Sequence, residues 1–278
     1  MENMVKKQLL LLLFLSLNFV SHNLGKIVAE ESYLTIGEEY GKPLLVLLET
    51  NPWLMVIGSD SPSFVLYDSG KLIYTIIENN NLKRHLTVLS QDEMKDFIEY
   101  LTIDKSIYDL EDFIESSTWT DQPFTIIYLD IVKTKKIVVY GSIARNPEAR
   151  NNTPFAFIQL YDKIKNYTNE NSVEWIPPKI EIMFWDYDYA PNKRDWIDGF
   201  PDLNSPSTIN HGNDFYSVFI DGNKYEILVN YLRNMGEREA VEINGKKMAI
   251  SYRIPFPNID ELKLLFESEE EEYDPLFY

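Results

Sequence analysis

The stretch EAVEINGKKMAISYRI, residues 239–254, decides the fold class of this chain. Runs of alternating apolar and polar residues flank its central Asn-Gly pair, which is the strongest short-range signal for a β-hairpin with a two-residue loop. Such a loop fixes the register and predicts Val241 opposite Met248 and Glu242 opposite Lys247. The second of these is then a cross-strand charge pair. The other face is apolar and carries Val241, Ile243, Met248, Ile250, Tyr252 and Ile254.

Further strands are predicted on both sides of this hairpin. Apolar runs bounded by Gly, Pro, Asn, Asp and Ser are typical of strands, and a short turn between two of them indicates a hairpin. The predicted hairpins are Phe64–Tyr67 with Leu72–Ile77, and Phe124–Asp130 with Lys136–Gly141. The remaining predicted strands are Leu44–Leu48, Trp53–Ile57, Lys179–Tyr189 and Phe215–Ile220.

Single helices are predicted between the hairpins. Ser90 and Glu93 form a capping-box pattern ahead of apolar residues at helical spacing. A second helix is expected to begin at Ser106 and a third at Thr153-Pro154, with threonine as the cap. Two more are expected, at Tyr225–Leu232 and from Asn258 onward. Hairpins interspersed with single helices predict an α+β protein of antiparallel sheets with helices packed on them.

The first 29 residues have the layout of a secretory signal peptide. Lys6 and Lys7 precede about a dozen apolar residues, too few to cross a bilayer as a helix. We therefore expect export to the periplasm or the medium; an uncleaved membrane anchor is the alternative. The chain is then expected to contain an N-terminal subdomain (30–170), a C-terminal subdomain (171–266) and an acidic tail (267–278), with a polar, proline-stiffened joint between the subdomains.

Composition excludes several classes of protein. The formal net charge is −18, and no cluster of lysine and arginine is apparent, so we expect no nucleic-acid partner. Cysteine is absent, which excludes disulfides, thiol catalysis and lipid attachment through a lipobox thiol. The signature motifs of zinc proteases, serine hydrolases and nucleotide-binding loops are absent too, and only His85 and His211 remain beyond the signal segment. We assign no catalytic residue, cofactor or metal ligand.

The stretch Phe184–Asn204 concentrates aromatic and carboxylate side chains. On a strand, Asp186 and Asp188 would face the same side about 7 Å apart. That spacing suits a shared calcium ion or an acid–base pair acting on a glycoside. Ala190 and Pro191, however, stand where a calcium loop needs other residues. We interpret the stretch as a structural loop that offers a binding surface, made of Asp186, Tyr187, Asp188, Trp196 and Asp198.

These patterns together predict an exported, non-enzymatic binding or interaction module. Its expected partner is a protein or glycan, and it would meet a membrane only if the N-terminal segment stays attached. The alternative is a carboxylate-dependent hydrolase that acts on glycans through Asp186 and Asp188, and a third interpretation is a calcium-stabilised adhesion domain.

Overall fold

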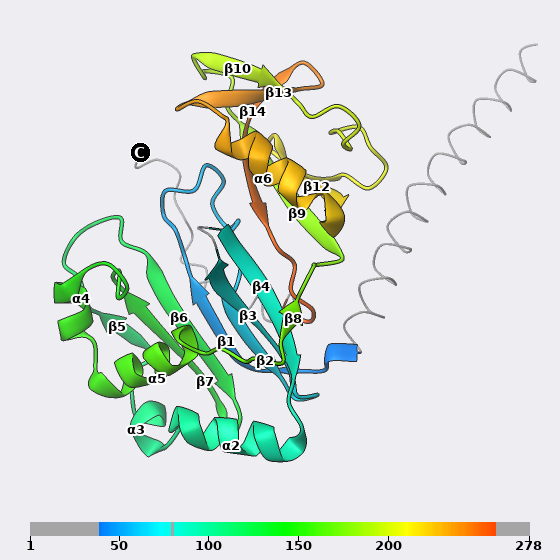
Figure 1. The fold of residues 1–278 in the computed structure, drawn as a ribbon. Helices are drawn as coiled ribbons and strands as arrows, with labels where there is room; N and C mark the ends of the chain where they lie inside the picture. The colour runs from blue at the N-terminus through cyan, green and yellow to red at the C-terminus, as the bar shows by residue number, and fades with distance from the viewer. Residues whose placement is uncertain (1–38, 79–80, 260–278) are drawn as a thin grey trace, which may run out of the picture.

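The computed structural model describes residues 39–78 and 81–259. Two mostly antiparallel sheets carry five helices, which confirms the predicted α+β class (Figure 1). The predicted signal peptide, the acidic tail and all but the first two residues of the predicted last helix lie outside the described residues. Within the described ranges, no helix is both long and apolar enough to cross a membrane.

The first sheet has eight strands in the order β5-β7-β6-β1-β2-β3-β4-β8, and only the β5–β7 pair is parallel. The β2–β3 hairpin turns on Gly70, whose φ of 84° and close approach to the carbonyl of Leu89 leave no room for a Cβ atom. The strands are β1 Pro43–Glu49, β2 Phe64–Tyr67, β3 Lys71–Glu78, β4 Asn81–Val88, β5 Phe113–Glu115, β6 Phe124–Asp130, β7 Thr134–Tyr140 and β8 Val173–Glu174.

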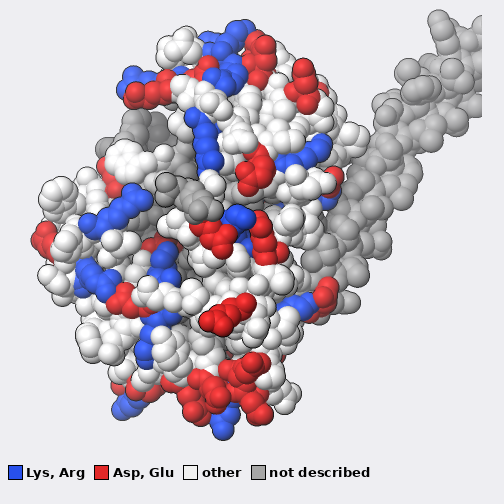
Figure 2. All heavy atoms as spheres, viewed as in Figure 1, with Lys and Arg blue, Asp and Glu red and all other residues white. Residues whose placement is uncertain are grey.

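Four helices cover one face of this sheet: α2 Gln91–Leu101, α3 Lys105–Tyr108, α4 Pro147–Asn152 and α5 Phe155–Lys165 (Figure 1). Both hydrogen bonds of the predicted capping box are present at the start of α2. Phe97 and Leu101 of α2 and Phe157 of α5 are buried in the core cluster that these helices share with the sheet. Acidic side chains gather over α2, at the opposite end of the molecule from α6 (Figures 1 and 2).

Two helix predictions need correction. The helix predicted from Ser106 stops at Tyr108, because the following residues leave the helix and Phe113–Glu115 pairs with β7 instead. Thr153 is not the side-chain cap of α5: its hydroxyl donates to the carbonyl of Ala149, 2.8 Å away, and Pro154 precedes the helix without a capping bond. In the first of these two cases, strand pairing with β7 outweighed the helical spacing of the apolar residues around Phe113.

The second sheet has six strands in the order β10-β13-β14-β9-β12-β11. The predicted register of the decisive hairpin is confirmed, with Val241 paired to Met248 and Glu242 to Lys247. The predicted charge pair is wrong, because Glu242 bonds to Lys193 at 2.6 Å. The elements are β9 Lys179–Asp186, β10 Asn192–Asp195, β11 Ile209–Gly212, β12 Phe215–Asp221, η1 Gly222–Lys224, α6 Tyr225–Arg233, β13 Glu239–Ile243 and β14 Lys246–Arg253.

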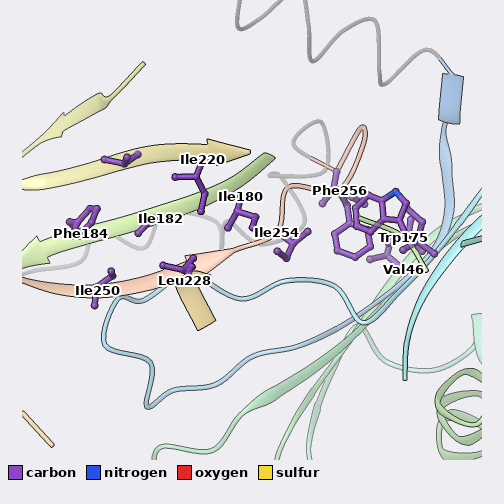
Figure 3. Packing of buried hydrophobic residues seen from close by; sticks show 14 of the residues in the cluster. Val46, Trp175, Ile180, Ile182, Phe184, Ile220, Leu228, Ile250, Ile254 and Phe256 are labelled. Atoms are coloured by element: carbon purple, nitrogen blue, oxygen red, sulfur yellow. The ribbon is translucent and has the colours of Figure 1, made fainter. Parts of the chain in front are cut away.

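One hydrophobic cluster joins the two sheets. Ile180, Ile182 and Phe184 of β9 extend along it, and it continues to Trp175 and Val46 (Figure 3). The ring of Trp175 packs against Phe256 at a centroid distance of 5.2 Å. The segment predicted as a polar joint therefore carries a buried tryptophan, and its residues Val173–Glu174 add strand β8 to the first sheet. The division into subdomains at residue 170 stays a prediction.

Candidate functional site

The loop between β1 and β2 reaches from the first sheet to the second. The backbone N–H of Val56 donates to the Ser251 hydroxyl on β14, 3.3 Å away, and the N–H of Ile254 donates to the Ser61 hydroxyl at 2.7 Å. Val56 itself is fully buried on the face of the second sheet that carries Met183. Figure 1 shows this loop rising beside β14.

The predicted strand Trp53–Ile57 is therefore wrong, and these residues belong to this loop. Their backbone bonds are local or lead to β14: the N–H of Leu54 donates to the carbonyl of Asn51 at 3.3 Å. The side chains of Trp53 and Ile57 are 75 % and 68 % exposed, whereas Val56 is buried. Val56 in this apolar run bonds to Ser251, 195 positions later in the sequence. No local sequence pattern reveals such a contact.

A half-buried carboxylate holds the loop closed. The backbone N–H of Asn51 donates to Asp60 Oδ1, 2.9 Å away, and so links the two ends of the loop. Burial raises the pKa of Asp60 to about 6, although the bond from Asn51 opposes the shift. The carboxyl group therefore gains its proton near pH 6 rather than near its ordinary pKa of 3.8.

The turn from α6 to β13 faces this loop. The N–H of Gly236 donates to Glu239 Oε2 at 2.7 Å, and the N–H of Glu239 donates to the carbonyl of Gly236 at 3.2 Å. Arg238, between them, has a φ of 57°, in the left-handed region that favours glycine. The turn thus holds Arg238 in a backbone conformation that is unfavourable for any residue with a side chain.

A cavity of about 350 Å³ lies between the loop and the turn. Its volume is in the range of small-molecule sites. Apolar side chains from three parts of the fold form most of its wall: the loop, the end of α6 and strand β14. The described residues that line it are Leu54, Met55, Leu232, Met235, Gly236, Arg238, Glu239, Ile250, Ser251 and Tyr252.

Most polar groups of the cavity already have protein partners. Glu239 accepts from Arg194 Nε at 3.2 Å and from the Gly236 N–H. The hydroxyl of Tyr252 lies 3.1 Å from that of Tyr225, and burial raises the Tyr252 pKa well above its ordinary value, so this group is uncharged at physiological pH. Arg238 differs: it is exposed, and no described carboxylate forms an ion pair with it. Of the two charged residues that line the cavity, Arg238 is thus the one without an ion pair to a described residue.

The five residues predicted as a binding surface differ in burial, and their role as a binding surface stays a prediction. Asp186 ends β9, and Asp188 follows in a turn closed by the bond from the Ala190 N–H to the Tyr187 carbonyl. Both aspartates are exposed, and the predicted spacing along a single strand does not apply. Tyr187 is buried beside Met183. None of these residues lines the cavity.

Trp196 and Tyr187 belong to different hydrophobic clusters. The ring of Trp196 packs edge-on against Phe184 at 5.2 Å, on the face of β9 opposite to Tyr187. Its Nε1 donates to the carbonyl of Pro201 at 2.8 Å. Trp196 thus anchors the loop to the core, whereas Asp198 is exposed.

Sequence reasoning also missed a polar row across the second sheet. Glu181, which is 5 % exposed, pairs with Arg253 and accepts from the Ser217 hydroxyl at 2.6 Å. Ser217 Oγ also lies 2.9 Å from His211 Nε2. In serine hydrolases the carboxylate orients the histidine, whereas here it accepts a hydrogen bond from the hydroxyl of a fully buried serine. We therefore interpret the row as a buried ion pair with its hydrogen bonds satisfied.

In the part of the chain that the structure describes, no three histidine, aspartate or glutamate side chains are grouped to hold a metal ion. The cavity between the β1–β2 loop and the α6–β13 turn is the candidate site, and the signal that could have drawn attention to it was an apolar run, residues 53–57, outside any hairpin. Comparison with known proteins finds no matching family model, no matching curated protein and no matching solved structure.

Proposed function

We propose that this protein is an exported, non-enzymatic binding module that holds a small apolar ligand in the cavity between the β1–β2 loop and the α6–β13 turn. The observation that carries the proposal is the cavity itself: its volume is about 350 Å³, and half of its lining residues are leucine, isoleucine or methionine. Apolar pockets with a few polar groups are the usual form of small-molecule sites.

The state of the polar groups in the wall favours binding over catalysis. Glu239 is held by Arg194, Ser251 accepts from Val56, and Tyr252 bonds to Tyr225. Groups engaged in this way are poorly placed to transfer protons to a ligand. The earlier expectation of a protein or glycan partner stays a prediction, as does the alternative of a glycan hydrolase.

A neutral fluorescent probe tests the proposal. We expect N-phenyl-1-naphthylamine to bind the wild type, with a rise in fluorescence as it leaves water. Leu232→Trp should fill the cavity and weaken binding at least tenfold, because Leu232 lines it. Ile227→Trp is the matched control, since Ile227 lies on the same helix and is 54 % exposed. Equal binding by both variants would refute the site.

Export rests on residues 1–29, and its test is independent of the ligand. Exported material should begin at or near Glu30, after the sequence Ile27-Val28-Ala29. N-terminal sequencing of the exported protein measures this directly. Recovery of the protein in the cytoplasm of its source cell, with Met1 retained, would contradict export.

A further inference from the structure

We propose that the ligand of the cavity is a small amphiphilic carboxylate, whose apolar chain enters the cavity while its carboxylate binds the guanidinium of Arg238. This inference rests on the proposed function and adds the chemical class of the ligand. Three observations carry it: the backbone of Arg238, the lack of an ion pair between Arg238 and any described carboxylate, and the apolar residues that line the same cavity.

The backbone conformation of Arg238 is the first observation. At a φ of 57° an arginine is strained, whereas glycine adopts this conformation freely. Strained residues persist where the surrounding structure enforces them, and they cluster at ligand sites. Contact between the Arg238 guanidinium and a ligand would account for an arginine in this strained conformation.

The second observation is the pairing of charges around the turn. Arg194 is engaged by Glu239, and Lys193 by Glu242. No described carboxylate pairs with Arg238, in a chain with 44 acidic and 26 basic residues. A guanidinium binds a carboxylate through two parallel hydrogen bonds, which makes this head group the fitting complement.

The third observation is the shape and lining of the cavity. Its 350 Å³ equal about a dozen water molecules in liquid volume, enough for a chain of several methylenes. Leu232 and Ile250 offer branched apolar walls. Met55 lies in the loop and Met235 in the turn. The unbranched methionine side chain adapts to ligand chains of different shape.

Calorimetric titration of the full chain with a series of carboxylates tests the inference. From butanoate to octanoate at pH 7.5, each added methylene should tighten binding about fourfold, as burial of a CH₂ group predicts. 1-Octanol, which has the same chain and no charge, should bind at least tenfold more weakly than octanoate. If octanol binds as well as octanoate, the inference is overturned while the proposed function stands. If octanoate, octanol and the neutral probe all fail to bind, the inference and the proposed function are both overturned.

Variants at Arg238 separate a binding role from a structural one. Arg238→Gly relieves the strained backbone, so its melting temperature should rise by about 2–4 °C while octanoate binds no better than octanol. Arg238→Lys keeps the charge and should retain an intermediate preference for the carboxylate. The control Arg233→Ala removes one positive charge at the end of α6, outside the cavity wall, and should bind like the wild type. An Arg238→Gly variant with an unchanged preference for octanoate would overturn the inference.

Discussion

The backbone N–H of Val56 donates a hydrogen bond to the hydroxyl of Ser251, so that a loop of the first sheet is fastened to a strand of the second. Val56 has no exposed surface, and Ser251 is 8 % exposed. The bond therefore satisfies a donor that water does not reach. It also sets the position of the loop that forms one wall of the cavity.

Ser251→Ala should destabilise the protein by about 1–3 kcal/mol, because it leaves the buried N–H of Val56 without an acceptor. Urea denaturation measures the change in the free energy of unfolding. Ser207→Ala, at an exposed serine, is the control and should lie within about 0.5 kcal/mol of the wild type. Equal stability of both variants would mean that the loop does not depend on this bond.

The fold was predictable where the signals were local. The Asn244-Gly245 turn fixed its hairpin register, and the Ser90–Glu93 capping box marked the start of α2. The cavity was not predictable, since Val56 and Ser251 are distant in sequence and neither belongs to a motif. The same limit affected Trp196: its ring and carboxylate neighbours resembled a ligand surface, but contact with Phe184 buries part of it. Non-local packing decides such cases.

Asp60→Asn should stabilise the protein at neutral pH. Burial raises the folded-state pKa of Asp60 to about 6, above the ordinary 3.8, so an ionised Asp60 weakens the folded state. A shift of this size would amount to about 3 kcal/mol for a group shielded from water, and partial exposure reduces our expectation to about 1 kcal/mol. Asparagine keeps an oxygen for the Asn51 N–H.

The pH dependence identifies the origin of this effect. Because the folded protein holds the Asp60 proton more tightly than the unfolded chain, the wild type gains stability from this group as the pH falls through about 6. The advantage of Asp60→Asn should therefore be full above pH 7 and shrink as the pH falls toward 4. Denaturation of both proteins from pH 7.5 to 4.5 measures it, with Asp188→Asn as the control for loss of one charge. A constant difference would contradict burial as the cause.

Gly222→Ala should destabilise the junction between the sheets. A Cβ atom built at Gly222 would lie 1.7 Å from the carbonyl oxygen of Pro177, which is backbone and cannot rotate away. We expect a loss of about 1–3 kcal/mol or more, as for overpacked cores. Gly236→Ala is the matched control, since the nearest atom to its Cβ would be 3.7 Å away. Thermal melts should separate the two variants; similar melting temperatures would show that the backbone yields at Gly222.

Trp196→Ala should act on stability, although its sequence context resembled a ligand-binding surface. The ring contacts Phe184, Phe200 and Tyr231 edge-on, at centroid distances of 5.2–5.8 Å. Removal of a tryptophan from such a cluster costs about 3 kcal/mol, the low end of the usual range, because Trp196 is only partly buried.

Substitutions of the exposed carboxylates in the same stretch should behave differently from Trp196→Ala. Asp186→Ala and Asp198→Ala should each change the free energy of unfolding by no more than about 0.5 kcal/mol, as surface substitutions do. Urea denaturation of the three variants, with probe binding to the cavity measured alongside, separates the roles. If Trp196→Ala were as stable as the wild type, its ring would not support the loop. A large loss of stability in Asp186→Ala would then point to a structural role for that carboxylate instead.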